Sequence, residues 1–495
     1  MRQLGGIDSM FVGAETPSMH LHVVGVMTLD VREMRGGDPR ARIRDLVSER
    51  IPLLVPFRWR LVESPIGIGA PHWIEDPDFD LDRHVLLTTL RSPGSVADLD
   101  RYVANVASTP LNRDRPLWEM HLVDGLADGQ VAVVTKLHHS FMDGGAGAEV
   151  MASLFDLEPE SDTPPPVDTW KPEAVPSTWD LLTEVPTNAL TRALRFPETA
   201  RRTVTGMGGL LGAMFPTADR DPRSYLAPRS PYNGTITPRR AVSLTDCSLD
   251  DVKRVKSAFG VTVNDVVLAA VASSLRADLE RRGALEALDG RPLIAAVPIS
   301  VRPADLERDF GNHTSAMMVP LPTHLDDPVE RLHAIHELAG STKQHHRAMG
   351  SDLFEEWAGL FPPWLVSTFS RTSDRLGLDR LTPPLFNVIV SNVQGSPIPL
   401  YLAGAEVTGI YPLGPLMSGN GLNITVISHC DRLHIGLIAE PTLVEHPDVL
   451  AGGIEVAVDE LLNLVPRPRS TTARRPKPTG TATGARRSRG VRAVG

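Results

Sequence analysis

A proline-rich stretch in the first half of the chain most constrains how this sequence can fold. Residues 158–178 read EPESDTPPPVDTWKPEAVPST. Proline lacks the backbone N–H that helices and sheets need, so the stretch excludes regular structure and is typical of a linker. The chain has 495 residues, which is too long for one typical hydrophobic core. We therefore expect two domains, one on each side of the linker.

The segments around the linker have different patterns. Residues 1–157 alternate strand-like runs, such as 20–30 and 130–139, with an amphipathic helical stretch at 95–108. Residues 158–231 form the linker and a helical, basic crossover, and residues 232–465 return to an α/β pattern. Apolar residues make up 42% and charged residues 22% of the chain, as in soluble globular proteins. The sequence predicts two α/β lobes joined by a crossover.

The two ends of the chain and its cysteines suggest where the protein works. Only two cysteines occur, so we expect no disulfide framework and a reducing compartment. The N-terminus lacks the basic and apolar pattern of a secretory signal, which favours a cytoplasmic protein. Residues 466–495 carry nine Arg or Lys and no acidic residue, and this composition predicts disorder. Such a tail can bind anionic lipid or simply stay solvated; nothing else suggests a nucleic-acid partner.

Membrane contact, if it occurs, is expected to be peripheral. No uncharged apolar stretch reaches the roughly 20 residues that a membrane-spanning helix needs. Residues 203–218 are apolar and follow several arginines, which is typical of a segment that lies on a membrane surface. Residues 357–369 are a second candidate, for membrane contact or an acyl-chain pocket. In both cases the alternative is ordinary packing against the protein core.

Two adjacent histidines, in the stretch TKLHHSFMDGGAGAEVM at 135–151, are the strongest candidate for chemistry. In a strand that continues to His139, side chains alternate between the two faces, so His138 and His139 point in opposite directions. Two such residues cannot both bind one metal ion, and no further metal-ligand motif accompanies them. We therefore expect no metal and no bound cofactor.

The same stretch fits a general base at a strand end. A neutral imidazole on a largely apolar face can accept a proton near physiological pH, which favours His139 in this role. Asp143 follows in a turn that Gly144 makes possible. The aspartate could orient the imidazole directly, or brace the loop by pairing with an arginine; we favour the brace. No GxSxG motif is present, so a covalent acyl-enzyme is not expected.

The spacing HHxxxDG, formed by His138, His139, Asp143 and Gly144, is the signature of the CoA-dependent acyltransferase superfamily. Residues 115–144 resemble the bacterial wax ester synthase/diacylglycerol acyltransferase family, whose PLW motif matches Pro116, Leu117 and Trp118. For Trp118 we expect a packing role rather than a catalytic one. Residues 261–279 resemble the ND motif of that family, and segments 8–25, 384–397 and 419–429 resemble further blocks. The likeness covers nearly the whole chain except the linker and the tail.

The resemblance implies a fold of two chloramphenicol-acetyltransferase-like α/β lobes with mixed sheets and an active-site tunnel between them. It implies transfer of a long-chain acyl group from acyl-CoA to diacylglycerol, or to a fatty alcohol to give a wax ester. Localisation is then expected to be cytoplasmic, at the inner face of the cell membrane or at lipid inclusions. Two alternatives stay open: a superfamily acyltransferase acting on a polyketide or other secondary-metabolite hydroxyl, and a non-catalytic lipid-droplet scaffold.

An acyltransferase of this kind also needs donors that stabilise the tetrahedral oxyanion. The candidates are Asn264, Ser391 and Asn392, and the resemblance places Asn264 and Asp265 near the active site. Each has a structural alternative. Asn264 is expected to cap the following helix in part, Asp265 to favour its dipole in the first turn, and Ser391 and Asn392 to end a strand or form a turn.

Overall fold

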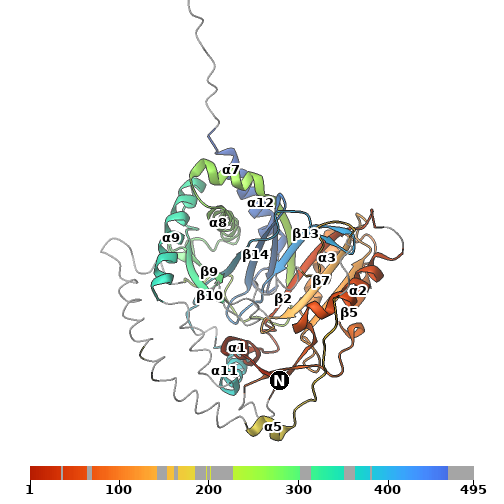
Figure 1. Cartoon of the computed structure of the whole chain (residues 1–495). Coiled ribbons are helices and arrows are strands. Elements are labelled where there is room, and N and C mark those ends of the chain that lie inside the picture. Colours follow the sequence, from red (N-terminus) through yellow and green to blue (C-terminus); the bar gives the residue numbers. More distant parts are fainter. Residues whose placement is uncertain are drawn as a thin grey trace, which may run out of the picture.

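The computed structural model describes residues 1–34, 37–63, 70–141, 153–160, 166–183, 197, 201, 227–300, 314–349, 363–378 and 382–466, and Figure 1 shows their arrangement. Two six-stranded mixed sheets lie side by side, each covered by helices, together with a small three-stranded sheet. This is the α/β architecture of two lobes that the sequence predicts.

The first sheet has the order β12-β13-β2-β7-β6-β5. Its strands are β12 (Tyr401–Leu402), β13 (Ala405–Leu413), β2 (His22–Asp30), β7 (Val131–His138), β6 (Trp118–Asp124) and β5 (Val85–Thr89). Only β5 and β6 run parallel. Helix α2 (Pro39–Arg50) packs on one face and α3 (Val96–Ala107) on the other. Because both faces are covered, every residue of β7 is buried, as expected for a strand in the middle of a sheet.

Smaller elements surround this sheet. The three-stranded sheet has the order β1-β4-β3, and α1 lies near it at the N-terminus. The bounds are β1 (Arg2–Gln3), α1 (Gly6–Ala14), the 3-10 helices η1 (Ile51–Leu53), η2 (Val55–Arg58) and η3 (Leu81–Arg83), β3 (Trp59–Val62) and β4 (His72–Glu75). Ser95 begins α3 with a capping box formed with Asp98, which satisfies backbone donors at the helix start.

The second sheet has the order β10-β9-β11-β14-β15-β8. Its strands are β8 (Ala241–Ser248), β9 (Leu293–Ser300), β10 (Thr314–Leu321), β11 (Val388–Val393), β14 (Leu422–His429) and β15 (Arg432–Ala439). The helices of this lobe are α7 (Leu249–Phe259), α8 (Val263–Arg281), η5 (Glu286–Leu288), α9 (Pro328–Met349) and α12 (Pro447–Asn463). Helix α11 (Pro363–Leu376) packs on α1 instead. Strand β11 runs parallel to both of its neighbours, β9 and β14.

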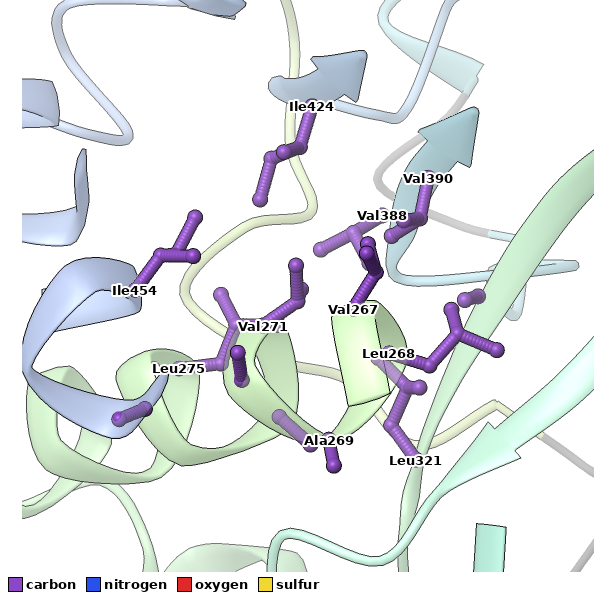
Figure 2. Packing of buried hydrophobic residues seen from close by; sticks show 14 of the residues in the cluster. Val267, Leu268, Ala269, Val271, Leu275, Leu321, Val388, Val390, Ile424 and Ile454 are labelled. Carbon is purple, nitrogen blue, oxygen red and sulfur yellow. The ribbon is translucent and has the colours of Figure 1, made fainter. Parts of the chain in front are cut away.

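Helix α8 forms the centre of the second lobe. Twelve of its 19 residues are buried, and Figure 2 shows Val267, Val271 and Leu275 pointing toward the strands and toward α12. A helix that is apolar around most of its surface has to be enclosed in this way. Its first turn is held by a capping box between Thr262 and Asp265. The N-cap is therefore Thr262, so the prediction that Asn264 caps this helix is wrong; Asp265 lies in the first turn, as expected.

The C-terminal half of the chain contributes two strands to the first sheet. Strands β12 and β13 come from the C-terminal half, yet β13 pairs with β2 in the first sheet, from Glu406↔Asp30 to Leu413↔Val24. Figure 1 shows β13, coloured for the C-terminal half, beside the strands of the N-terminal half. A division into lobes at residues 157 and 232 does not include this contribution, because the pairing of β13 with β2 joins strands that are far apart in the sequence. The lobe boundaries otherwise stay a prediction.

The sheets also pack closely against each other. A third apolar cluster joins Val24, Val26 and Val103 of the first lobe to Val242 and Ile438 of the second. At one point a Cβ on Gly436 of β15 would lie 2.2 Å from the carbonyl oxygen of Pro412 in β13. Only a residue without a side chain permits this approach. The lobes therefore share one packed interface.

The described part of the linker has no regular structure, and it lies on the first lobe. Asp168 pairs with Arg58, at 2.7 Å between Oδ1 and Nη1. The Arg58 guanidinium also lies over the ring of Trp170, 5.2 Å from its centroid. A short helix, α5 (Thr178–Thr183), follows. The predicted surface segment 203–218 and the tail from residue 467 lie outside the described residues.

Among the described helices, none is by itself long and apolar enough to cross a membrane. One bent pair, α7 with α8 at an angle of 102°, meets the length and composition requirement together.

Candidate active site

The paired histidines lie where β7 ends. The backbone N–H of His138 donates to the carbonyl of Leu117, at 3.0 Å, and that of His139 donates to the carbonyl of Leu21, at 2.9 Å. Leu117 directly precedes β6 and Leu21 directly precedes β2, which are the two neighbours of β7 in the sheet. The strand ends at His138 rather than at His139, and a turn begins with His139. Hydrogen bonds to the segments that lead into both neighbouring strands thus fix the backbone positions of the two histidines.

His138 is enclosed by protein. Its side chain is 2% exposed. The Ser140 N–H donates to Nδ1 at 3.1 Å, and the Ser140 hydroxyl lies 2.7 Å from the same nitrogen. Because Nδ1 accepts from a backbone donor, the ring proton is on Nε2, which lies 3.7 Å from a carboxylate oxygen of Glu15. His138 is therefore held in one tautomer and one orientation.

Glu15 connects His138 to a half-buried arginine. The Arg113 Nε donates to Glu15 at 3.1 Å, and another guanidinium nitrogen donates to the carbonyl of Val12 at 3.0 Å. Burial alone would raise the pKa of Glu15, but hydrogen bonding to His138 and the charge of Arg113 lower it to about 2. The arginine also pairs with Glu63 at 2.7 Å. This network fixes the C-terminal end of α1 beside the histidine pair.

Sequence reasoning did not predict this network. Glu15 follows a short helix and lies within the segment 8–25 that resembles the family, and Arg113 comes shortly before the PLW motif. Neither residue has a distinctive neighbour in sequence. The one available signal was the acidic residue directly after the apolar run 10–14, and its partner is 98 positions away.

The change Glu15→Gln tests how much this network stabilises the protein. Hydrogen bonds to charged groups contribute about 2 kcal/mol, so we expect a loss of that size near neutral pH. The folded pKa of Glu15 lies below its ordinary value of 4.5. Its stabilising effect is therefore complete above about pH 4.5 and is lost as the pH falls through about 2. Urea unfolding should show a wide gap between variant and wild type near neutral pH, and a shrinking gap below about pH 4.5.

Glu445→Gln is a matched control for that change. Glu445 is an exposed carboxylate of the second lobe, and such surface changes stay within about 0.5 kcal/mol. Equal effects of the two substitutions on the free energy of unfolding, both near neutral pH and below about pH 4.5, would contradict a stabilising role of the network.

His139 has a different environment from His138. Its side chain is half-buried, and its ring lies 4.5 Å from the ring of Phe11 in α1, at an interplanar angle of 34°. Val133 and Leu137, which precede it at alternate positions, lie in an apolar core. Of the two rings, His139 is the one that is partly exposed and that packs against an aromatic side chain.

A small cavity lies at the junction of the lobes, next to the backbone of this site. It has a volume of about 10 Å³, enough for about one water molecule. Its lining comes from both lobes: His20, Leu21, His22, Arg240, Pro415, Leu416 and Ile438. Burial, and then the charge of Arg240, lower the pKa of His20. Leu21, which accepts the His139 N–H, is part of the cavity wall. The longer predicted tunnel is not traced by the described residues and stays a prediction.

The PLW motif supports the strand that carries the histidines. Trp118 is fully buried; its indole N–H donates to the carbonyl of Phe57 at 2.8 Å, and its ring stacks on His84 at 4.5 Å. The carbonyl of Leu117 accepts the backbone N–H of His138, and Pro116 directly precedes Leu117. These contacts are structural, in line with the predicted packing role of Trp118.

Asp143 and Gly144 lie outside the described residues. Their predicted roles, in bracing the loop and permitting its turn, stay predictions.

The second-lobe candidates gather at the start of α8. The Asn392 amide donates to Oδ1 of Asn264 at 3.3 Å, and Asp265 lies 2.7 Å from Nδ1 of His336. Ser391 and Asn392 are in β11, opposite Thr425 and Val426 of β14. Their hydrogen bonds within the described part of the chain stay in the second lobe, and none reaches His139. Asn264 and Asn392 are therefore brought together, whereas an oxyanion role for them or Ser391 stays a prediction.

No group of three or more histidine, cysteine or acidic side chains suited to a metal ion occurs among the described residues.

Known structures share this architecture. The wax ester synthase/diacylglycerol acyltransferase from Marinobacter aquaeolei VT8 aligns over 94% of this chain and 100% of its own, with a TM-score of 0.68 and 26% identity. The first condensation domain of the calcium-dependent antibiotic synthetase aligns over 95% of this chain and 98% of its own, with a TM-score of 0.56 and 17% identity. The second likeness shows the fold alone.

Sequence comparison specifies the family. Residues 4–267 match the wax ester synthase/diacylglycerol acyltransferase catalytic domain, and residues 310–462 match the C-terminal domain of the same proteins. A Mycobacterium tuberculosis H37Rv protein, named as a candidate diacylglycerol O-acyltransferase, is 35% identical over 92% of this chain and 94% of its own length. Another from the same strain is 33% identical over 93% and 90%.

Fold and site together define an acyltransferase built from two α/β lobes, with paired histidines at the end of a central strand. The chain belongs to the wax ester synthase/diacylglycerol acyltransferase family. The predicted family is thereby confirmed, and the protein is an enzyme.

Proposed function

We propose that this protein transfers a long-chain acyl group from acyl-CoA to the free hydroxyl of diacylglycerol, giving triacylglycerol. The observation that carries the proposal is the difference in exposure between the two histidines: His138 is enclosed and held by Ser140, while His139 is half-buried and lies against Phe11. Of this pair, only His139 is partly exposed, as a ring that has to meet a substrate hydroxyl must be. The names of the mycobacterial relatives support diacylglycerol as the acceptor.

In this mechanism His139 is the general base. Its imidazole accepts the proton of the acceptor hydroxyl as the oxygen attacks the thioester carbonyl carbon. The tetrahedral intermediate then collapses, the C–S bond breaks, and the imidazolium gives its proton to the CoA thiolate. Transfer is direct, without an acyl-enzyme. A positioned base contributes about 10²–10⁴-fold in rate, so oxyanion donors must contribute as well.

The surroundings of His139 suit this chemistry. Phe11 packs against the ring, and an apolar neighbour of this kind strengthens electrostatic interactions with a developing charge. The Glu15–Arg113 pair holds the end of α1, and α1 in turn holds Phe11 against the ring. Fatty alcohols are a second acceptor of the same chemical type, and their products would be wax esters. No bound cofactor is required, because acyl-CoA is a co-substrate.

We also propose that the protein works on the cytoplasmic side, at the inner face of the cell membrane or at lipid inclusions. Diacylglycerol and triacylglycerol are water-insoluble, so the enzyme has to meet its acceptor at a lipid surface.

A thiol-release assay tests the proposal directly. Purified protein is incubated with palmitoyl-CoA and either diolein or hexadecanol, and free CoA thiol and the lipid product are measured in parallel. We expect acceptor-dependent thiol release, with triacylglycerol formed from diolein. Binding of neutral lipid without thiol release from either acceptor would refute the proposal and support the scaffold alternative. Release with hexadecanol alone would identify a wax ester synthase.

A further inference from the structure

Helix α11 has the reverse of the amphipathic arrangement expected in a water-soluble protein. The exposed positions fall on one side of the helix: Trp364, Leu365, Thr368, Phe369, Arg371, Thr372, Arg375 and Leu376. Trp364 is 44%, Leu365 40%, Phe369 68% and Leu376 66% exposed. A surface helix normally turns such residues toward the core. The alternative that residues 357–369 are ordinary core is therefore wrong for Trp364, Leu365 and Phe369.

The opposite side of α11 carries mostly small and polar residues, with Val366 among them, and it faces the protein. Ser367, Ser370, Ser373 and Asp374 are all less exposed than the apolar positions. The Ser18 hydroxyl donates to Asp374 at 3.2 Å, and α11 packs along α1. Figure 1 shows the two helices side by side, at the end of the molecule where α5 also lies. The helix is thus held with its large apolar side chains outward.

The outer face also carries positive charge. Arg371 and Arg375 are exposed, while Asp374, the acidic residue of α11, is turned toward Ser18. The whole chain has a net charge of −10, so this face differs in sign from the average of the protein. Aromatic and aliphatic side chains beside arginines match a layer of phospholipid with anionic headgroups. Contiguous apolar patches of this kind mark interaction sites rather than random exposure.

We propose that the outer face of α11 docks on the surface of an anionic phospholipid layer. Trp364, Leu365, Phe369 and Leu376 enter the headgroup region, and Arg371 and Arg375 contact the phosphates. The inference deepens the proposed function, because α11 packs on α1, and Phe11 of α1 contacts the His139 ring. Docking there brings the lipid surface to the helix that borders the catalytic histidine, so that diacylglycerol has a short path to the site.

Vesicle flotation tests the docking without relying on catalysis. Full-length His139→Ala protein is floated with phosphatidylglycerol/phosphatidylcholine vesicles and with phosphatidylcholine vesicles. Binding should be stronger on the anionic vesicles. The double change Leu365→Ser and Phe369→Ser should weaken that binding by about 10-fold or more, and the pair Arg371→Gln and Arg375→Gln by about 10-fold. High salt should remove the arginine effect but not the apolar one.

The matched control is Val456→Ser. Val456 of α12 is 68% exposed, the same fraction as Phe369, and it lies on a helix at the far end of the second lobe (Figure 1). Its binding should equal that of the parent protein. Equal binding by the Leu365/Phe369 variant, or an equal loss in the control, would overturn the docking. Failure of the parent to float, together with a concentration-dependent dimer that the Leu365/Phe369 change abolishes, would overturn it in favour of self-association.

An activity measurement separates this inference from the proposed function. In the otherwise wild-type protein, the Leu365/Phe369 variant should lose turnover of vesicle-borne diolein but keep turnover of a dispersed short-chain alcohol. If wild type acylates neither acceptor, the proposed function fails while the flotation result still decides the docking. If the variant acylates vesicle-borne diolein at the wild-type rate, the docking inference fails and the proposed function stands.

Discussion

The change His139→Ala is expected to lower kcat by about 10²–10⁴-fold, with little change in the unfolding midpoint. The ring is half-buried and lies against Phe11, so its removal takes away the base but few packing contacts. The measurement is thiol release at saturating palmitoyl-CoA and diolein, with thermal unfolding of the same preparation. A folded variant with wild-type turnover would refute the assignment of the base.

His138→Ala is the matched comparison, because it removes the neighbouring imidazole. His138 is enclosed and lies beside Glu15, so this change leaves a buried carboxylate without that partner. We expect a clear loss of stability, on the order of 2 kcal/mol, as well as reduced activity. The two variants should therefore differ in their effects: the His139 change lowers kcat alone, whereas the His138 change also lowers the stability of the fold. The opposite pattern would exchange the roles of the two residues.

The second large effect is expected from Gly436→Ala. A Cβ at this position would lie 2.2 Å from the Pro412 carbonyl and 2.9 Å from a Leu413 methyl group. The backbone of β13 cannot move aside without disturbing its pairing with β2, so the sheets must separate. Overpacking of this kind costs about 3 kcal/mol. Denaturant unfolding should show a lower midpoint, and limited proteolysis should cut between the lobes.

Gly452→Ala provides the control for that change. Gly452 lies inside α12, and a Cβ there would meet no atom within 4 Å. Alanine in a helix interior stabilises by about 0.5–1 kcal/mol relative to glycine. The same substitution should therefore raise the midpoint at one glycine and lower it at the other. A neutral or stabilising Gly436→Ala would show that the sheets are not in close contact.

Much of the architecture could be predicted because it depends on local patterns. The proline-rich linker, the apolar run of β7 and the position of the histidine pair at the end of that run follow from nearby residues, although the strand ends at His138 and not at His139. The sequence also contains the signal for the capping box of α8, because Thr262 precedes Asp265 by three positions. The structural alternative for Asn264, a role as the cap of this helix, is wrong.

Long-range pairing could not be predicted in the same way. The alternating pattern of β13 fits an outer strand of either sheet, and nothing in it specifies β2 as a partner. The pairing of Glu15 with Arg113 has the same origin, since both residues resemble ordinary surface charges in sequence. The reversed polarity of α11 is similar: an amphipathic helix shows that it has two faces, but only its packing on α1 shows which one points outward.

The pairing of β13 with β2 has a consequence for how the chain folds during synthesis. Sequentially distant pairings form slowly and leave strand edges exposed until they form. During synthesis β2 leaves the ribosome early, but its neighbour β13 ends only at Leu413. The edge of β2 therefore stays uncovered until more than four fifths of the polypeptide has been translated. For that interval the nascent first sheet is a natural client for a chaperone.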